Sequence, residues 1–334
     1  QQGLAALNKY KQNNIIQSPP QEIVDQLVNL YNQGQLKSVF TQAQGLSEQY
    51  PKIFIVWKLL GLSAVQIGML EEAIDAFKKC ISLEPNFVDA YINLGVAFKN
   101  QGKFDEAIDA FKKCILLKPN YAEAYSNMGI ALNDQDKLDE AIEAFNKALL
   151  IKPDYAEAYS NMGVTLKEQG KLDEAIEVLN KALFYKPNYL DAYINIGVTY
   201  KDQGKFDEAM KAYYKCLTLK PDNAEVYSNM GNALKDQGKF DEAIDAYKKC
   251  ILLKPDYAVA YNNKGIALNN QGKLEEAIEN FNKALSLKPD FADAYYNNSF
   301  SYNLKGNLQE GLKLYEWRLK MKCFPARAPR KKFI

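Results

Sequence analysis

The chain has 334 residues, with 42 basic and 41 acidic side chains, a formal net charge of +1 and no histidine. This balance gives no strong overall field for nucleic acid or an anionic membrane. The lack of histidine removes the commonest general base and metal ligand, which argues against most hydrolytic and zinc enzymes. We therefore expect a chain without catalytic residues, cofactors or metal ions of its own.

The cysteines and the hydrophobic residues indicate a soluble, cytoplasmic protein. The five cysteines lack metal-ligand spacing. Four of them share one recurring position that alanine fills elsewhere, so we expect small buried side chains in a reducing compartment. No run of about 18 apolar residues and no signal-peptide core occurs. The four recurring cysteines are Cys80, Cys114, Cys216 and Cys250.

The chain begins with two atypical segments. Residues 1–19 are polar and rich in Gln and Asn, which predicts a weakly ordered leader that ends before Pro20. Residues 20–53 form a degenerate unit with Gly34 and Pro51 in turn positions, and with Leu27 where later units have glycine. We expect this unit to act as a cap, because the first unit of a repeat array has only one neighbour.

Residues 54–291 contain seven copies of one 34-residue unit. A period of this length with aromatic, Gly, Ala and Pro marks predicts stacked helix-turn-helix units. In each copy, we expect a first helix after the proline, a turn, and a second helix that runs to the next proline. The marks are Gly61, Gly95, Gly129, Gly163, Gly197, Gly231 and Gly265, and Pro85, Pro119, Pro153, Pro187, Pro221, Pro255 and Pro289.

Three local predictions follow from this unit. The turn requires a left-handed backbone, which suits six glycines and is tolerated by Asp136. The residue after each proline, such as Asn120, is predicted to cap the first helix, with Glu123 completing a capping box. Gly129 and Ala141 stand where the two helices approach closely, and the recurring aromatic residues are expected to fill the space between units.

An asparagine two residues before each recurring glycine has no evident packing role. Asparagine is about 0.6–0.7 kcal/mol less favourable than alanine in a helix, so seven copies need a compensating interaction. One hypothesis is that each amide bonds a neighbouring unit. The other is a ladder of amides that accepts from the N–H groups and donates to the carbonyls of an extended peptide. The residues are Asn93, Asn127, Asn161, Asn195, Asn229, Asn263 and Asn297.

The repeat loses its characteristic residues towards the end of the chain. In residues 292–322, Ser299 replaces the glycine and Gly311 the alanine, which predicts a divergent repeat or a capping helix with Tyr315 and Trp317 shielding the last core. Residues 323–334 form a basic tail. A few cations without interleaved aromatic residues are weak evidence for nucleic-acid or membrane binding, so we expect neither partner.

Across residues 20–322, the pattern Tyr-x-x-x-Gly, glycine turn, Asp-Glu-Ala-Ile and Lys-Pro resembles the tetratricopeptide repeat. The resemblance implies an all-α, right-handed superhelical α-solenoid whose first helices line a concave groove for proteins or peptides. The asparagines are similar to the ladder in the repeat arm of O-linked N-acetylglucosamine transferases. The segment from Gly311 to Arg318 is similar to the G-x-x-x-Y-E-W-R junction that precedes bacterial glycosyltransferase domains.

Two functions are consistent with these observations. The first is a non-catalytic scaffold that holds an extended segment of a partner protein through the seven asparagines. The alternative is the substrate-recruiting arm of a glycosyltransferase whose catalytic domain lies beyond Ile334. Weak self-association through the convex face or the ends is a further alternative. An acidic terminal motif is a poor ligand, because the groove lysines and arginines of dicarboxylate-clamp arrays are missing here.

Overall fold

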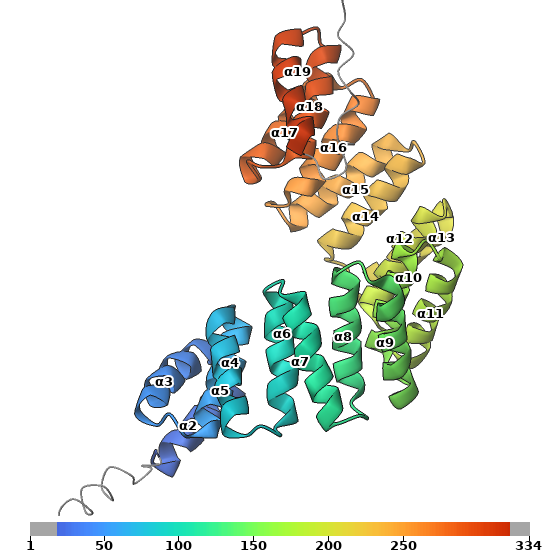
Figure 1. Cartoon of the computed structure of the whole chain (residues 1–334). Helices are drawn as coiled ribbons and strands as arrows, with labels where there is room; N and C mark the ends of the chain where they lie inside the picture. Colours follow the sequence, from blue (N-terminus) through green and yellow to red (C-terminus); the bar gives the residue numbers. More distant parts are fainter. Residues whose placement is uncertain (1–18, 321–334) are drawn as a thin grey trace, which may run out of the picture. The chain divides into compact units, whose positions relative to one another are not determined.

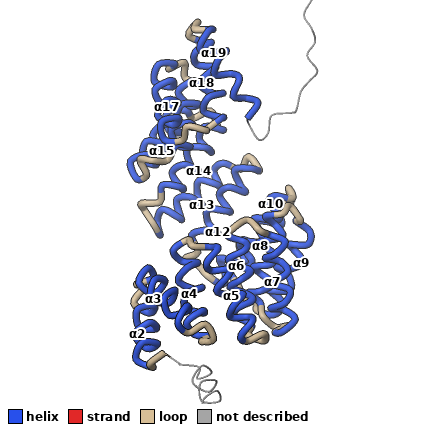
Figure 2. Tube along the Cα trace, turned by 60° about the vertical axis from the view of Figure 1, so that its left-hand side comes forward, coloured by secondary structure: helices blue, strands red, loops and turns tan. Residues whose placement is uncertain are grey.

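The computed structural model describes residues 19–320, and within this range every regular element is a helix (Figures 1 and 2). The chain divides into two compact units, one ending at Gln169 and the other beginning at Gly170. The predicted all-α array of helix-turn-helix repeats is confirmed. The basic tail and nearly all of the predicted leader lie outside the described residues.

Within each unit, the helices come in pairs of a first helix, a short turn and a second helix packed against it. First helices of the first unit are α2 (Gln21–Asn32), α4 (Phe54–Ile67), α6 (Val88–Asn100), α8 (Ala122–Asp134) and α10 (Ala156–Glu168). The second helices are α3 (Leu36–Gln49), α5 (Leu70–Leu83), α7 (Phe104–Leu117) and α9 (Leu138–Ile151).

The second unit begins with a second helix, α11 (Leu172–Tyr185). Its first helices are α12 (Leu190–Asp202), α14 (Ala224–Asp236), α16 (Ala258–Asn270) and α18 (Ala292–Leu304). Their partners are α13 (Phe206–Leu219), α15 (Phe240–Leu253), α17 (Leu274–Leu287) and α19 (Leu308–Tyr315), followed by a 3₁₀ helix, η1 (Glu316–Lys320).

The turns inside the pairs adopt the left-handed backbone that the sequence predicts. Eight turn glycines have φ between 72° and 84°. Asp136 has φ 61° and is the one non-glycine residue with positive φ in the described range. Beside it, the N–H of Lys137 donates to the carbonyl of Leu132 at 3.0 Å, so a bond of the Schellman type closes the end of α8.

A glycine of the first helix and an aromatic ring of the second form the core of each pair. A Cβ atom on Gly129 would lie 2.8 Å from Cε1 of Phe145, and one on Gly95 would lie 2.5 Å from Cε1 of Phe111. Both rings are fully buried, as is Ala141. The rings therefore fill a slot inside their own pair, and they belong to a buried cluster that spans neighbouring pairs.

Aromatic side chains also hold the Lys-Pro loops between pairs. The ammonium group of Lys118 lies 4.3 Å from the ring centroid of Tyr121, a cation–π contact that recurs in later loops. The hydroxyl of Tyr91 donates to the carbonyl of Pro85 at 3.0 Å, and the indole of Trp57 donates in the same way to its own preceding loop. These contacts fix each first helix to the loop before it.

The predicted capping of the first helices by the residue after each proline is wrong. The N-cap of α8 is Tyr121, whose side chain makes no capping bond, so Asn120 lies one residue too early. Glu123 lies in the first turn, where its carboxylate interacts favourably with the helix dipole. The same one-residue shift applies at Asp154, Asn188, Asp222, Asp256 and Asp290.

Side-chain hydrogen bonds join one pair to the next at the turns. A glutamine at the end of a first helix donates from Nε2 to an aspartate in the first turn of the preceding second helix. In the first unit the bonds are Gln135 to Asp105 and Gln169 to Asp139, both 2.8 Å. In the second unit they are Gln203 to Asp173 at 2.9 Å and Gln271 to Asp241 at 2.8 Å.

The described part of the chain ends in a group of stacked aromatic residues. Trp317 of η1 stacks on Tyr295 of α18 with ring centroids 3.9 Å apart, and the ring of Tyr315 lies 5.6 Å from that of Tyr296. The guanidinium of Arg318 lies 4.3 Å from the centroid of Tyr315. Tyr315 and Trp317 therefore cover the last first helix, as the sequence predicts.

Candidate functional site

Within each unit, the first helices lie on the inner side of the stack. In the first unit, α4 contacts α6, α6 contacts α8, and α8 contacts α10; in the second, α12, α14, α16 and α18 contact each other in order. Consecutive second helices in the described residues do not approach one another in this way. Because the first helices are the more closely spaced, their free faces line the inner side of each unit.

One stripe of each first helix remains free on this side, and α8 shows its composition. Glu123, Asn127, Ile130 and Asp134 are four, three and four residues apart, a spacing that places them on one helix face. Glu123 and Asp134 are exposed, and Asn127 and Ile130 between them are half-buried. Met128 is not part of this face, because it turns towards the second helices. We call these four positions of a first helix the inner stripe.

All seven asparagines predicted from the sequence lie at the second position of the inner stripe. Each is half-buried, so each residue keeps part of its surface exposed. The first unit holds Asn93, Asn127 and Asn161, and the second holds Asn195, Asn229, Asn263 and Asn297. Each unit therefore has its own row of amides on its inner side.

The seven asparagine amides differ in whether they form hydrogen bonds within the protein. Nδ2 of Asn93 donates to the carbonyl of Asp89, one turn earlier, at 2.7 Å. The side chains of Asn127, Asn161 and Asn229 make no hydrogen bond to any residue in the range 19–320. Each of these three amides has two N–H donors and a carbonyl acceptor, all of which remain available to a ligand or to water.

In α16 and α18, the amides bind one another. Nδ2 of Asn297 donates to Oδ1 of Asn262 at 3.1 Å, and Nδ2 of Asn262 donates to Oδ1 of Asn263 at 3.1 Å. Nδ2 of Asn263 donates to Oδ1 of Asn232 at 3.0 Å, which also accepts from the hydroxyl of Tyr247 at 2.8 Å. At this end of the array, the asparagines bond neighbouring pairs, as the first of the two hypotheses requires.

Carboxylates occupy the two outer positions of the inner stripe along much of the chain. They are Glu123 and Asp134 in α8, Glu157 and Glu168 in α10, Asp191 and Asp202 in α12, and Glu225 and Asp236 in α14. In the second unit, Asp202 and Asp236 pair with the preceding lysines at 3.0 Å and 3.2 Å, which partly neutralises them. Sequence reasoning missed these rows, although the spacing of four, three and four residues is visible in the sequence.

The carboxylates contribute to raised pKa values of nearby tyrosines. Burial, together with the charges of Glu123 and Asp89, raises the pKa of Tyr121 to about 12. Burial and Glu123 also raise the pKa of Tyr155. Negative charge on a phenolate is thus unfavourable beside these carboxylates. Burial is the larger cause of both shifts, and the carboxylates add to it.

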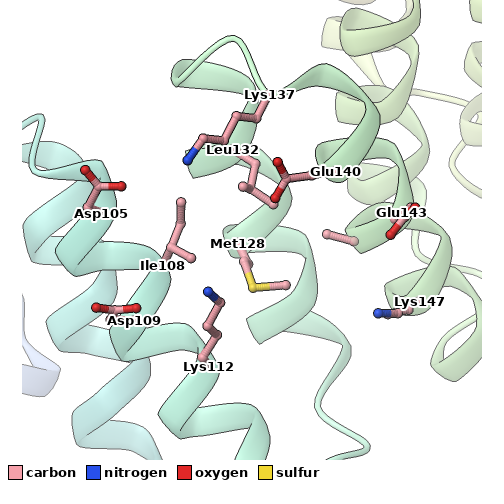
Figure 3. Close-up of a pocket in the computed structure, with 11 residues that line it drawn as sticks. Asp105, Ile108, Asp109, Lys112, Met128, Leu132, Lys137, Glu140, Glu143 and Lys147 are labelled. Carbon is pink, nitrogen blue, oxygen red and sulfur yellow. The ribbon is translucent and has the colours of Figure 1, made fainter.

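A separate cavity of about 300 Å³ lies on the outer side of the first unit, between α7 and α9 (Figure 3). Its apolar lining comes from Ile108, Met128, Leu132 and Ala144. None of the seven asparagines lines this cavity, so it is distinct from the inner stripe. Its charged rim mixes both signs and consists of Asp105, Asp109, Lys112, Lys137, Glu140, Glu143 and Lys147.

The four recurring cysteines are buried in the helix pairs. Cys80, Cys114, Cys216 and Cys250 are buried free thiols, and burial raises the pKa of Cys114 to about 11, which disfavours a reactive thiolate. Among residues 19–320, no group of three or more His, Cys, Asp or Glu side chains is arranged to hold a metal ion. Over the same range, no helix combines the length and the hydrophobicity needed to cross a membrane.

Comparison with protein families gives the same repeat. Profiles described as tetratricopeptide repeat match residues 88–121, 120–183, 224–257 and 258–291. A profile described as TPR repeat matches residues 61–102, 165–204 and 199–238. Together the matches run without a gap from residue 61 to residue 291, which is more than half of the chain. No curated protein sequence matches the chain.

Several solved structures have a similar fold. A tetratricopeptide repeat protein from Parabacteroides merdae gives a TM-score of 0.59 at 19% identity, covering 81% of this chain and 98% of that one. The APC/C hetero-tetramer Cut9-Hcn1 gives 0.55 at 17% identity, with 83% and 56% covered. Pseudomonas aeruginosa pilF gives 0.52 at 21% identity, with 62% and 94% covered. At these identities, the likeness shows the fold alone.

Proposed function

The chain belongs to the tetratricopeptide repeat proteins, and on this basis we propose that it is a non-catalytic scaffold that holds an extended segment of a partner protein against its inner stripe. The peptide backbone lies on the amide row. Its alternate side chains contact the third position of the stripe, where Ile130 and Val164 offer half-buried apolar surface.

The unused hydrogen-bonding capacity of Asn127, Asn161 and Asn229 carries this proposal. In place of alanine, each asparagine lowers helix stability by about 0.6–0.7 kcal/mol, and at these three positions no bond within the described residues offsets that loss. An amide can donate to a peptide carbonyl and accept from a peptide N–H. Repetition at one helix position suits the regular backbone of an extended chain better than a folded partner.

A recruiting arm of a glycosyltransferase is a second candidate with narrower support. It rests on the resemblance of the asparagines and of the segment from Gly311 to Arg318. The packing of Trp317 on Tyr295 gives that segment a second, structural explanation. The reading frame after Ile334 separates the two functions, since a following nucleotide-sugar-binding domain would support the arm and a stop codon would exclude it.

The test of the scaffold is the triple variant Asn127→Ala, Asn161→Ala and Asn229→Ala of the whole chain. The probe is a fluorescein-labelled peptide selected from a random library on the wild-type chain, and the readout is anisotropy. The variant removes two amides from the first unit and one from the second, so a peptide on the first unit loses four hydrogen bonds of about 0.5–1.5 kcal/mol each and should bind at least tenfold more weakly. The variant should unfold at the same or a higher urea concentration, because alanine favours the helix.

A control makes the same chemical change elsewhere. Asn146 and Asn180 are exposed on second helices, so Asn146→Ala with Asn180→Ala should leave peptide affinity unchanged. If the triple variant keeps full affinity and loses stability instead, the three amides are structural, and the proposed function is wrong.

A further inference from the structure

Asparagine amides without a hydrogen bond lie on the same helices of the first unit as pairs of carboxylate side chains. In α8, the free amide of Asn127 lies between Glu123 and Asp134 on the inner stripe. In α10, the free amide of Asn161 lies between Glu157 and Glu168. In α6 the fourth position of the stripe is a neutral asparagine, and there the amide already bonds a backbone carbonyl.

In the last two first helices of the second unit, the amides are bonded and the stripe carries fewer carboxylates. Asn263 in α16 is bonded within the protein, and its stripe neighbours are the uncharged Val259 and Asn270. Asn297 in α18 is also bonded, and Leu304 takes the last position of its stripe.

The unbonded amides Asn127, Asn161 and Asn229 each lie between two carboxylates, whereas the bonded amides Asn93, Asn263 and Asn297 have at most one carboxylate beside them. Asn195 departs from this rule, because it lies between Asp191 and Asp202 and still interacts within the protein. On α8 and α10, two consecutive helices combine an unbonded amide with two carboxylates, and we take their inner stripe as the recognition surface.

Three of the four inner-stripe carboxylates of α8 and α10 are poorly neutralised by the described part of the protein. No basic residue lies on α8, and Lys167 is the one basic residue on α10. Glu123, Asp134 and Glu168 form no ion pair with a residue in the described range. Glu168 accepts one hydrogen bond, at 2.9 Å, from a neutral asparagine, which leaves its charge in place. Burial raises the pKa of Tyr121, and the charge of Glu123 adds to this shift.

We propose that the inner stripe of α8 and α10 selects an extended segment carrying lysine or arginine side chains. This rests on the proposed function, because the backbone of the segment must lie on Asn127 and Asn161. Its cations then pair with Glu123, Asp134 and Glu168.

The dimensions allow this arrangement. The carboxylate positions lie about 6 Å and 10 Å along the helix axis from the amide, since an α-helix rises about 1.5 Å per residue. An extended chain points alternate side chains to opposite sides, so one segment can direct cations towards both rows. The long stems of lysine and arginine span such distances while keeping the charged group in water.

The test uses three fluorescein-labelled peptides of equal length that share one sequence, with Lys, Gln or Glu at two adjacent positions in every four, so that both sides of the extended chain carry the variable side chain. The wild-type chain should bind the Lys peptide best and the Glu peptide least. The variant Glu123→Gln, Asp134→Asn, Glu168→Gln should bind the Lys peptide roughly fivefold to tenfold more weakly, as expected for three partly exposed ion pairs. Its affinity for the Gln peptide should not change.

The control variant Asp109→Asn, Glu140→Gln, Glu143→Gln removes the same number of charges from the rim of the outer cavity. It should keep the full preference for the Lys peptide. The single variant Glu123→Gln and the loss of Lys-peptide affinity at high salt provide further readouts if the triple variant folds poorly.

The outcomes separate the two proposals. If none of the three peptides binds the wild-type chain, the proposed function itself fails. If all three bind equally, or the Glu peptide binds best, peptide binding stands and the charge preference is overturned. Equal loss of Lys-peptide affinity in the inner and outer variants would also overturn it, because the effect would then come from net charge alone.

Discussion

Two glycine-to-alanine substitutions should change stability in opposite directions. A Cβ on Gly129 would lie 2.8 Å from Cε1 and 2.9 Å from Cζ of Phe145, a ring with no exposed surface and hence no free space to move into. Such overpacking is unfavourable by about 1–3 kcal/mol, against a gain of about 1 kcal/mol in helix propensity. Gly45 in α3 has no atom within 4 Å of an added Cβ. Gly45→Ala should therefore bring only the gain in helix propensity.

Urea unfolding followed by circular dichroism measures both changes. Gly129→Ala should lower the free energy of unfolding by about 1 kcal/mol, and Gly45→Ala should raise it by a similar amount. In a Phe145→Leu background, the loss caused by Gly129→Ala should largely disappear, since the ring is the obstacle. A stabilising effect of Gly129→Ala equal to that of Gly45→Ala would refute the packing argument.

Three further predictions concern single side chains. The buried hydroxyl of Tyr213 has no partner in the described residues, whereas that of Tyr247 donates to Asn232, so Tyr213→Phe should stabilise and Tyr247→Phe destabilise by about 1 kcal/mol each in urea unfolding. Asp136→Gly should raise the melting temperature by relieving about 0.5–1 kcal/mol of left-handed backbone strain. Burial raises the pKa of Cys114 from 9.0 to about 11, so its thiol favours folding fully below pH 9 and progressively less as the pH rises to 11. The difference in urea midpoint between wild type and Cys114→Ala should shrink over that range.

The repeat period alone is enough to predict the helices and the turns. The aromatic rings were predicted to fill the space between units, whereas the rings of Phe111 and Phe145 fill a slot inside their own pairs, against Gly95 and Gly129. The left-handed turn at Asp136 could be predicted because few other residues tolerate that backbone. The capping residues were predicted wrongly because the first helices begin one residue later than the proline indicates. At that position, Tyr121 stacks with Lys118 across the loop, a tertiary contact that propensity rules do not include.

The position of each asparagine on its helix was predictable from the sequence, but its hydrogen bonding was not. Repetition in the sequence shows where each asparagine falls on its helix, and the acidic rows could have been found from the same spacing. Whether an amide is free depends on neighbours from other pairs. Asn263 is bonded because Asn232 replaces the apolar residue that other first helices carry at that position, and Asn262 completes the network. A single repeat does not reveal such contacts.

The central claim is that the free amides of the inner stripe bind a peptide backbone. The most direct measurement follows the side-chain amide NMR signals of the asparagines, each assigned by substitution, while the Lys peptide is added to the whole chain. Signals of Asn127, Asn161 and Asn229 should shift in proportion to occupancy, and those of Asn263 and Asn297 should stay in place because their partners are internal. Peptide binding that leaves the first three signals unchanged would contradict the claim.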